Sequence, residues 1–580
     1  MKPPAQQSPE GEELAHYDDA IIGKAFRWSA VAFAVIVAGG AGAFFFLKKK
    51  PAQPPPKVTQ IVAPVTQTFA SIEVPEVKFA DVTAQAGITF VHNNGATGEK
   101  LLPETMGGGV GFFDFDNDGD QDLLFVNSTY WPDKTPNGKQ ATSSALYQND
   151  GKGNFKDVTA GSGLDVPFYG MAPALGDFDN DGLVDVFITA VGGNHLFKNL
   201  GNGKFKEVTA ETGVGGLPDG WSTCATWFDY DNDGKLDLFV GNYIRWSREI
   251  DLKVGWKLTG IGRAYGQPKD FEGAFPYLYH NDGNGKFTEV TAAAGLQIKN
   301  PATGVPAAKT LGVAPVDVNG DGWLDLVVAN DTVQNFLFLN QHDGTFKEIG
   351  GRSGIAFDSF GATRGAMGID TARYRDDNAL GVIIGNFANE MTALYVSQNS
   401  SGEILFTDEA LTEGIGAPSR LPLKFGVFFF DYDLDGRQDI LSANGHLEEE
   451  ISKIQKSQTY KQAAQLFWNC GPTKSGCFVP VSAAKAGNDL FSPIVGRGSA
   501  FADIDGDGDL DVVLTQPGGK PILLRNDQGL GNHWLRVKLI GQKANRDAIG
   551  ATVHVRVQGK DLWRQVMPTR SYLSQSELPV

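Results

Sequence analysis

A carboxylate-rich pattern repeats six times along this chain. Each copy reads D-x-D-x-D-G-x-x-D or a close variant, and the copies begin at Asp114, Asp177, Asp229, Asp317, Asp431 and Asp503. The side chains at positions 1, 3, 5 and 9 of such a loop can converge on one cation. Position 7 can add a backbone carbonyl, and the glycine at position 6 permits the sharp turn. Hard oxygen ligands in this number suit calcium better than zinc or copper.

The sequence therefore predicts about six Ca²⁺ sites. The fourth loop has Asn319 at position 3, so it offers one carboxylate fewer than the others. The predicted ligands, in chain order, are Asp114, Asp116, Asp118, Asp120, Asp122, Asp177, Asp179, Asp181, Leu183, Asp185, Asp229, Asp231, Asp233, Lys235, Asp237, Asp317, Asn319, Asp321, Trp323, Asp325, Asp431, Asp433, Asp435, Arg437, Asp439, Asp503, Asp505, Asp507, Asp509 and Asp511.

Two other interpretations of the loops are an EF-hand and an acidic turn. An EF-hand needs a bidentate Glu at position 12, but that position is taken by Phe125, Ile188, Val240, Val328, Ser442 and Leu514. The residues after each loop have the pattern of a strand, so each loop is expected to join two strands. The second alternative is an acidic turn without metal, although chance seldom repeats such spacing six times.

The charge of the chain agrees with metal loops. The formal net charge is −18, and much of this acidity falls within the six loops. It therefore does not imply a basic partner. Because clustered carboxylates repel one another, the loops are expected to be mobile when no metal is bound.

A second repeated element follows the loops and indicates the elements that position them. It consists of an aromatic residue, an Asn, a glycine-rich turn and a Phe, as in the segment 147–159, and it recurs at Phe197, Tyr279 and Phe338. Such turns are typical of β-hairpins. A further unit around Asp370 keeps the strand pattern but has Ala372, Tyr374 and Asn378 at ligand positions, so no calcium is expected there.

Seven units of about four short strands each predict an all-β, seven-bladed β-propeller over residues 77–530. The last unit lacks its final strand, and an isolated copy of that strand, 79–83, precedes the first loop. We expect the N-terminal strand to complete the seventh blade and close the ring. An open β-solenoid and two packed sandwiches are the alternatives.

These residues resemble FG-GAP repeats, also called VCBS-like repeats, over roughly residues 77–527. The segments 532–541, 545–555 and 571–576 look like the ASPIC/UnbV domain, which is expected to form a small β-rich C-terminal domain over 531–580. The combination is similar to the cartilage acidic protein 1 family. That resemblance implies calcium binding and extracytoplasmic interaction but no reaction. The family's tail continues beyond such a segment, so this domain is expected to be short or truncated.

The N-terminal region contains an apolar run. Residues 28–47 carry no charge and match the roughly 20 residues that cross a bilayer as a helix. A tail, 1–27, precedes this run and a Pro-rich linker, 48–76, follows it. A retained single-pass anchor is favoured over a cleaved signal peptide. The flanking charges leave the orientation open, but calcium sites of this type favour a propeller on the periplasmic or extracellular side.

Several other features leave alternatives open. Cys470 and Cys477 are either a small disulfide loop or two reduced thiols, and Cys224 is expected to be a buried thiol. An aromatic and arginine-rich insert, 243–276, contains Trp246 and Trp256 and either binds a ligand or packs a loop. The segment 448–465 is expected to be a helix that caps the surface.

No familiar catalytic motif occurs in the sequence, and nothing suggests nucleic-acid binding. An enzyme is therefore less favoured than a binding protein, although distant loops of a propeller can still assemble an active site. The sequence favours a membrane-anchored calcium-binding scaffold for adhesion or for a protein or glycan partner. The alternative is a lectin or a carbohydrate-active, lyase-like enzyme on the same scaffold.

Overall fold

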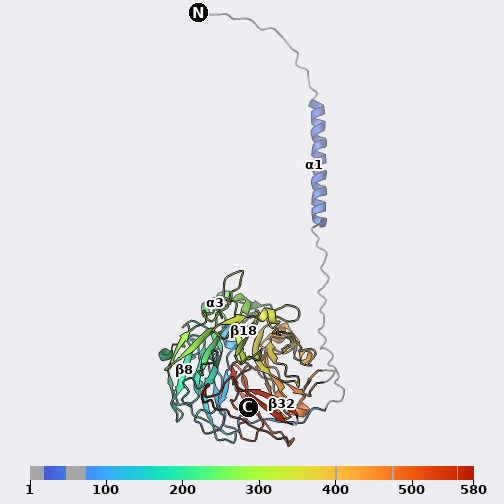
Figure 1. Cartoon of the computed structure of the whole chain (residues 1–580). Coiled ribbons are helices and arrows are strands. Elements are labelled where there is room, and N and C mark those ends of the chain that lie inside the picture. The colour runs from blue at the N-terminus through green and yellow to red at the C-terminus, as the bar shows by residue number, and fades with distance from the viewer. Residues whose placement is uncertain (1–18, 48–72, 133, 399–401, 473–475, 558) are drawn as a thin grey trace, which may run out of the picture. The chain divides into compact units, whose positions relative to one another are not determined.

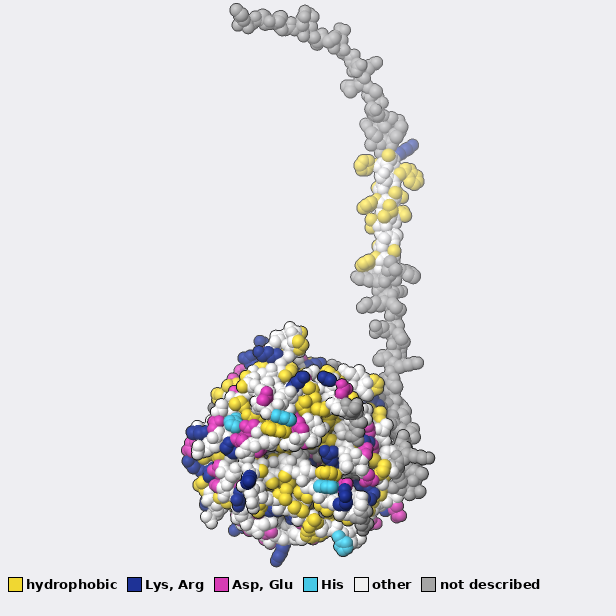
Figure 2. All heavy atoms as spheres, viewed as in Figure 1, with side chains coloured by type: hydrophobic (Ala, Val, Ile, Leu, Met, Phe, Trp, Pro, Cys, Tyr) yellow, Lys and Arg dark blue, Asp and Glu magenta, His cyan; other side chains and the backbone are white. Residues whose placement is uncertain are grey.

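The computed structural model describes residues 19–47, 73–132, 134–398, 402–472, 476–557 and 559–580. The chain divides into two compact units, Met1–Val65 and Thr66–Val580. In the first unit, α1 spans Asp19–Leu47, and Figure 2 shows hydrophobic side chains exposed along it. The segment Gly23–Phe44 is long and apolar enough to cross a membrane, although a signal sequence near the N-terminus meets the same test. Most of the predicted linker lies outside the described residues.

The second unit is a seven-bladed β-propeller (Figure 1), which confirms the predicted architecture. Each blade is an antiparallel sheet of four strands, and consecutive strands run from the axis outward. The strands of the first three blades are β2 (Val110–Phe113), β3 (Asp122–Phe125), β4 (Ala145–Asn149), β5 (Phe155–Asp157), β6 (Gly170–Gly176), β7 (Asp185–Ala190), β8 (His195–Asn199), β9 (Phe205–Glu207), β10 (Ser222–Phe228), β11 (Asp237–Asn242), β14 (Tyr277–Gly283) and β15 (Lys286–Glu289).

The remaining blades repeat this arrangement. Their strands are β16 (Thr310–Val316), β17 (Asp325–Asn330), β18 (Phe336–Asn340), β19 (Phe346–Glu348), β20 (Ala366–Ala372), β21 (Gly381–Asn386), β22 (Ala393–Ser397), β23 (Phe406–Asp408), β24 (Lys424–Phe430), β25 (Asp439–Asn444), β26 (Gln465–Asn469), β27 (Phe478–Pro480), β28 (Ser499–Ala502), β29 (Asp511–Leu514), β30 (Ile522–Asn526) and β1 (Phe79–Asp81).

The ring closes as the sequence predicts. Strand β1 pairs antiparallel with β30, and Phe79 lies opposite Asn526 in the register. The N-terminal strand thus supplies the outermost strand of the seventh blade. This pairing covers the edge that β30 would otherwise expose.

Seven hydrophobic clusters lie between neighbouring blades. The cluster between the second and third blades, for example, packs Phe178 and Phe187 from one sheet against Trp227 and Leu238 from the next. Each blade therefore buries both of its faces, which explains why strands such as β7 are buried at every residue. An eighth cluster, built around Met171, Trp221 and Tyr572, fills the centre of the ring.

A buried Asn at the end of the third strand links most blades to the preceding one. The Asn199 amide donates to the backbone carbonyl of Phe115 in the first blade, and Asn526 donates to that of Tyr432 in the sixth. Asn149, which links the first blade to Ile504, belongs to the same series. Because each donor satisfies a carbonyl at the base of a loop, these bonds fix the loops relative to one another.

The C-terminal residues belong to the same compact unit as the propeller. Strands β31 (Thr552–Val557) and β32 (Lys560–Gln565) form a hairpin of their own. The following strands, β33 (Thr569–Arg570) and β34 (Ser574–Gln575), join the first blade, where β34 pairs in parallel with β2. The predicted domain thus merges with the propeller, because its last segment is buried in the ring.

This terminal segment fills the central channel. Tyr572 is fully buried, and its hydroxyl donates to the carbonyl of Met106 at 2.9 Å. The Ser571 hydroxyl accepts from the backbone N–H of Val427, and Ser499 donates its N–H to Ser574. Gly368 lies so close to the channel that an added Cβ would stand 2.2 Å from the carbonyl of Phe425. The Ser-Tyr-Leu-Ser motif is therefore a plug that contacts the innermost strands of several blades.

The predicted helix over 448–465 is wrong. Only α6, Ile451–Ile454, is helical there. The side chain of Gln462 instead accepts the backbone N–H of Leu423, and Gln458 donates to the carbonyl of Leu421. These tertiary contacts hold the segment in an irregular path and override its helical pattern.

The remaining short elements lie in the connections. They are η1 (Leu102–Thr105), α2 (Thr209–Thr212), α3 (Arg248–Val254), β12 (Lys257–Leu258), β13 (Gly262–Arg263), η2 (Pro268–Asp270), α4 (Gly350–Ser353), α5 (Gly416–Ser419), α7 (Ala483–Ala486) and η3 (Asp489–Phe491). All three cysteines are free thiols, and burial raises the pKa of the Cys224 thiol to about 12. The structure therefore favours the reduced form of Cys470 and Cys477.

Candidate metal centres

The six acidic loops share one backbone conformation. Each joins the first and second strands of its blade, so all six lie at the same end of the ring. The residue at position 4 has a left-handed φ in every loop, for example 61° at Asn117 and 55° at Leu434. The glycine at position 6 has a φ of 91° at Gly182, a value that only glycine adopts without strain.

The aspartate at position 1 organises the turn. In the second loop, Asp177 accepts the backbone N–H of Asp181 at 3.0 Å and that of Gly182 at 2.7 Å. Asp229 and Asp431 make the equivalent pairs of bonds in their loops. The position-1 side chain is therefore held inside the loop, where a cation at the loop centre would meet it.

The aspartate at position 9 joins the loop to the third strand. One oxygen of Asp185 accepts the N–H of Phe178, and the other accepts the N–H of Asn199. The side chain is fully buried, and burial raises its pKa to about 9. Burial likewise raises the pKa of Asp122 to about 8 and that of Asp325 to about 7. Among the residues that the structure describes, no basic side chain forms an ion pair with Asp122, Asp185 or Asp325, so a bound cation would stabilise their ionised forms.

Carboxylates at positions 1, 3, 5 and 9 meet within several loops. Ligand atoms of three acids lie within 4.8 Å of one another in each group. The groups are Asp114, Asp116 and Asp122; Asp177, Asp179 and Asp185; Asp229, Asp231 and Asp233; and Asp431, Asp433 and Asp439. The position-5 side chain also accepts a hydrogen bond from the backbone N–H of position 7, as Asp181 does from Leu183. Coordination by the position-7 carbonyls stays a prediction.

Some loop oxygens are buried without a hydrogen-bond partner. They are Oδ1 of Asp114, Asp116, Asp231 and Asp505. A buried polar atom without a partner is rare in a folded protein and indicates a missing water or ion. Because these atoms belong to carboxylates beside other carboxylates, a cation is the partner that fits.

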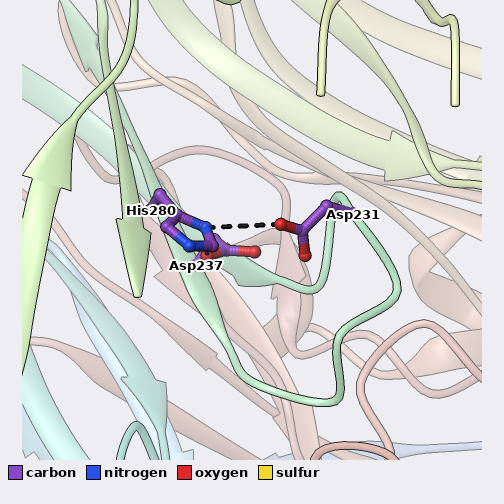
Figure 3. A group of neighbouring side chains, drawn as sticks. All are labelled: Asp231, Asp237 and His280. Atoms are coloured by element: carbon purple, nitrogen blue, oxygen red, sulfur yellow. Dashed lines mark ion pairs between the residues drawn. The ribbon is translucent and has the colours of Figure 1, made fainter. Parts of the chain in front are cut away.

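The third strand of several blades adds a side chain that the sequence patterns did not reveal. His280 on β14 places Nδ1 3.4 Å from Asp231 and 3.3 Å from Asp237, as Figure 3 shows. The neighbouring carboxylates raise the pKa of His280. In other blades, Gln148 donates to Asp116 and Trp468 donates to Asp433. Each of these residues immediately precedes the repeated Asn, and that position was the available signal.

Basic residues of the C-terminal segment reach three of the loops. Lys538 lies 3.2 Å from Asp114, Arg536 lies 3.1 Å from Asp503, and Arg564 lies 3.2 Å from Asp431. All three acids are position-1 residues. Sequence reasoning missed these contacts because no local spacing links them. The C-terminal segment therefore covers the end of the ring that carries the loops.

The fifth blade lacks the acidic loop, and its position-1 carboxylate pairs with an arginine. Asp370, at its position 1, accepts from Arg570 at 2.7 Å and from the backbone N–H of Phe429 at 2.8 Å. The side chain is 3% exposed. The guanidinium of the central plug thus supplies the positive charge beside Asp370.

Comparison with known proteins agrees with this geometry. The FG-GAP-like repeat family matches residues 114–188, 177–240, 317–384 and 431–514, and the ASPIC and UnbV family matches residues 541–580. Cartilage acidic protein 1 of Xenopus tropicalis is 26% identical over 231 residues, 39% of this chain and 32% of that protein. The mouse protein is 25% identical over 253 residues, 43% of this chain and 34% of that protein. The match thus spans about a third of these relatives.

Among solved structures, an Agrocybe aegerita lectin that recognises non-reducing terminal N-acetylglucosamine aligns with a TM-score of 0.39 at 18% identity. The alignment covers 67% of this chain and 88% of the lectin. An alignment this weak says nothing about what this chain binds. The family matches and the loop geometry agree that the chain is an FG-GAP-repeat β-propeller with a C-terminal ASPIC and UnbV domain, distantly similar to cartilage acidic protein 1.

Proposed function

We propose that this protein is a calcium-binding propeller that acts as an interaction scaffold outside the cytoplasm. The observation that carries the proposal is the set of buried loop oxygens without partners, among them Asp114 Oδ1 and Asp505 Oδ1. Calcium accepts six to eight oxygen ligands and tolerates irregular geometry, which suits loops that combine carboxylates with backbone oxygens. In each loop the bound ion would neutralise the clustered charge and rigidify the turn.

The role of calcium is structural in this proposal. The loops lie between the first two strands of their blades, and the Asn bonds connect each loop base to the neighbouring blade. Ordering the loops therefore orders one end of the whole ring. Extracellular calcium modules have dissociation constants near 10⁻⁴–10⁻³ M, and this favours a calcium-rich compartment. The apolar helix α1 supports secretion or anchoring by its length and composition.

A calcium titration of residues 73–580 by calorimetry tests the metal assignment. We expect about six ions bound at micromolar to millimolar calcium and a rise in melting temperature. The variant Asp505→Ala removes the position-3 oxygens, which an Asn such as that of the fourth loop would partly retain, and it should lose one ion. Absence of binding at 10 mM calcium, or an unchanged stoichiometry in the variant, would contradict the assignment.

Crosslinking in native membranes tests the scaffold role. The full chain would be recovered with calcium and with a chelator, and a chain carrying Ala at position 3 of each loop would serve as the control. A scaffold should recover a defined partner with calcium only, and the control should not recover it. Equal recovery under all conditions would contradict a calcium-dependent interaction.

A further inference from the structure

A cavity of ≈ 440 Å³ opens at the end of the ring opposite the acidic loops. Its lining comes from residues that follow the second strands, such as Asp331 and His446, and from the starts of first strands, such as Met367. The loops lie at the other ends of these same strands. Its volume falls in the range of about 300–1,000 Å³ that small-molecule sites occupy.

The cavity has aromatic walls. Trp256 and Tyr265 come from the insert between β11 and β14, and Phe387 comes from the fifth blade. All three rings are only partly buried. Lys269 and Lys100 lie over the rings of Trp256 and Tyr265, each 5.7 Å from the ring centre, so a ligand would meet the parts of the rings that these lysines leave uncovered. The predicted binding role of the insert therefore centres on Trp256. Trp246 is buried and packs against Trp131 and Trp221, so of the two roles left open by the sequence the structure favours packing for this residue.

A buried carboxylate oxygen in the cavity lacks a partner. Glu448 is 4% exposed; its Oε1 pairs with Lys100, while its Oε2 has no hydrogen-bond partner. Such an atom costs free energy unless a ligand or water donates to it. It therefore indicates a ligand that presents an O–H or N–H group at this point.

Two neighbouring groups extend the hydrogen-bonding pattern. Nδ1 of His446 accepts the backbone N–H of Glu448, so the neutral ring carries its proton on Nε2. Burial and the charge of Arg497 lower the pKa of His446 to about 4, which keeps the ring neutral. Asp331 is 8% exposed and accepts the Tyr243 hydroxyl at 2.6 Å. The cavity thus offers Nε2–H of His446 as a hydrogen-bond donor and the carboxylates of Glu448 and Asp331 as acceptors.

The charges around the cavity favour a neutral ligand. Asp331, Glu390 and Glu448 line it, with Lys269 at the rim. This lining would repel an anion. Lys100 already pairs with Glu448, and the charge of Lys309 acts on Asp331, so the carboxylates do not need a cationic ligand.

We infer that this cavity binds a neutral saccharide. A sugar ring combines apolar C–H faces, which pack on aromatic rings, with hydroxyl groups that both donate and accept. Those are the features that Trp256, Glu448 and His446 provide. The inference goes beyond the calcium-dependent scaffold, because the cavity uses none of the loop ligands.

Saturation-transfer NMR and calorimetry with residues 73–580 in calcium test the inference. The probes are glucose, galactose, mannose, N-acetylglucosamine and cellobiose, with galacturonate as the charged counterpart of galactose. We expect saturable binding of at least one neutral sugar and none of galacturonate. Trp256→Ala should weaken binding about tenfold, the loss typical of an aromatic anchor. Trp563→Ala, on the hairpin at the opposite end of the ring, should leave it unchanged.

The outcomes separate this inference from the metal proposal. No binding by any neutral sugar, stronger binding of galacturonate, or equal losses in the two tryptophan variants would each overturn it. Glu448→Gln is the second cavity variant in case Trp256→Ala unfolds, and it should also weaken binding. Calcium stoichiometry is measured on the same samples, so a failure of the calcium titration would overturn the metal assignment without changing the sugar result.

Discussion

The fifth blade and the second blade differ in what lies beside the carboxylate at position 1. In the fifth blade Asp370 contacts the guanidinium of Arg570, which belongs to the same chain. In the second blade Asp177 accepts backbone N–H groups of its own turn, and the described residues place Lys198 beside Asp179 and Asp181 of the loop but not beside Asp177. The strands are otherwise equivalent in the two blades. The propeller architecture therefore accommodates a blade whose position-1 carboxylate pairs with an arginine of the chain, without an acidic loop, and we expect only the blades with acidic loops to gain stability from calcium.

The largest expected loss of stability comes from removing the guanidinium group of Arg570. Arg570→Met leaves Asp370 charged and buried, which should cost about 3–5 kcal/mol of the free energy of unfolding. Chemical denaturation with calcium and with a chelator should show the same loss. The double variant Asp370→Asn/Arg570→Met should recover part of it. A loss that calcium abolishes would mean that the fifth blade also binds the ion.

A somewhat smaller loss in the free energy of unfolding is expected when position 9 of an acidic loop is replaced. Asp185→Ala removes the acceptor for two buried N–H groups, on Phe178 and Asn199, at a cost of about 2–4 kcal/mol. The loss should persist in chelator, because these bonds do not involve the ion. Asp181→Ala is the control: its side chain is exposed, and in chelator it should cost less than about 1 kcal/mol. Equal losses of stability in Asp185→Ala and Asp181→Ala would contradict the interpretation that Asp185 joins the loop to the third strand.

A calcium-specific effect is expected at position 3. Asp116→Asn keeps a side-chain oxygen for Gln148 but removes a charge from the first loop. At a free calcium concentration of 100 times the dissociation constant, complete loss of one site would cost about 2.7 kcal/mol, and a site weakened by Asn should cost a part of that. In chelator the variant should be no less stable than the natural protein, because Asp114 and Asp118 no longer repel a third charge. Melting curves under the two conditions separate these effects, and a variant that keeps the full calcium response would refute the assignment.

The smallest effect concerns Lys538, which contacts Asp114 from the C-terminal segment. Its side chain is 55% exposed, so the pair contributes less than about 1 kcal/mol. Lys538→Gln removes a charge that competes with calcium, and it should tighten binding at the first loop about twofold to threefold at low salt. Calorimetry at low and high salt measures this change. Weaker binding in the variant would mean that Lys538 assists the ion.

The sequence predicted features that depend on short, fixed spacing. The six loops, the strands around them and the closing strand β1 were all visible as local repeats, and the register of Phe79 with Asn526 confirms the closure. His280 was missed because a single sequence does not show which strand residue points at a loop. Arg564 and Arg570 were missed because their acidic partners lie far away in the chain.

The failures also have physical causes. The segment 448–465 carries a helical pattern, but Gln462 bonds the backbone of another loop and prevents a helix. Trp246 and Trp256 are alike in sequence, yet one is buried among other tryptophans and the other lines the cavity. Only the fold distinguishes a packing aromatic residue from an available one. The residues around Glu448 likewise meet only when the blades assemble.

Closure by β1 has a consequence for the order of synthesis. The ribosome makes β1 before any blade, but its partner β30 is among the last strands to emerge. Strand β1 must therefore stay without its partner while the first six blades are synthesised. The final blade can form only after translation is nearly finished. The plug at Tyr572 emerges later still and enters a ring whose two ends have just met. Truncation at either end would thus leave an unclosed intermediate with an exposed strand edge.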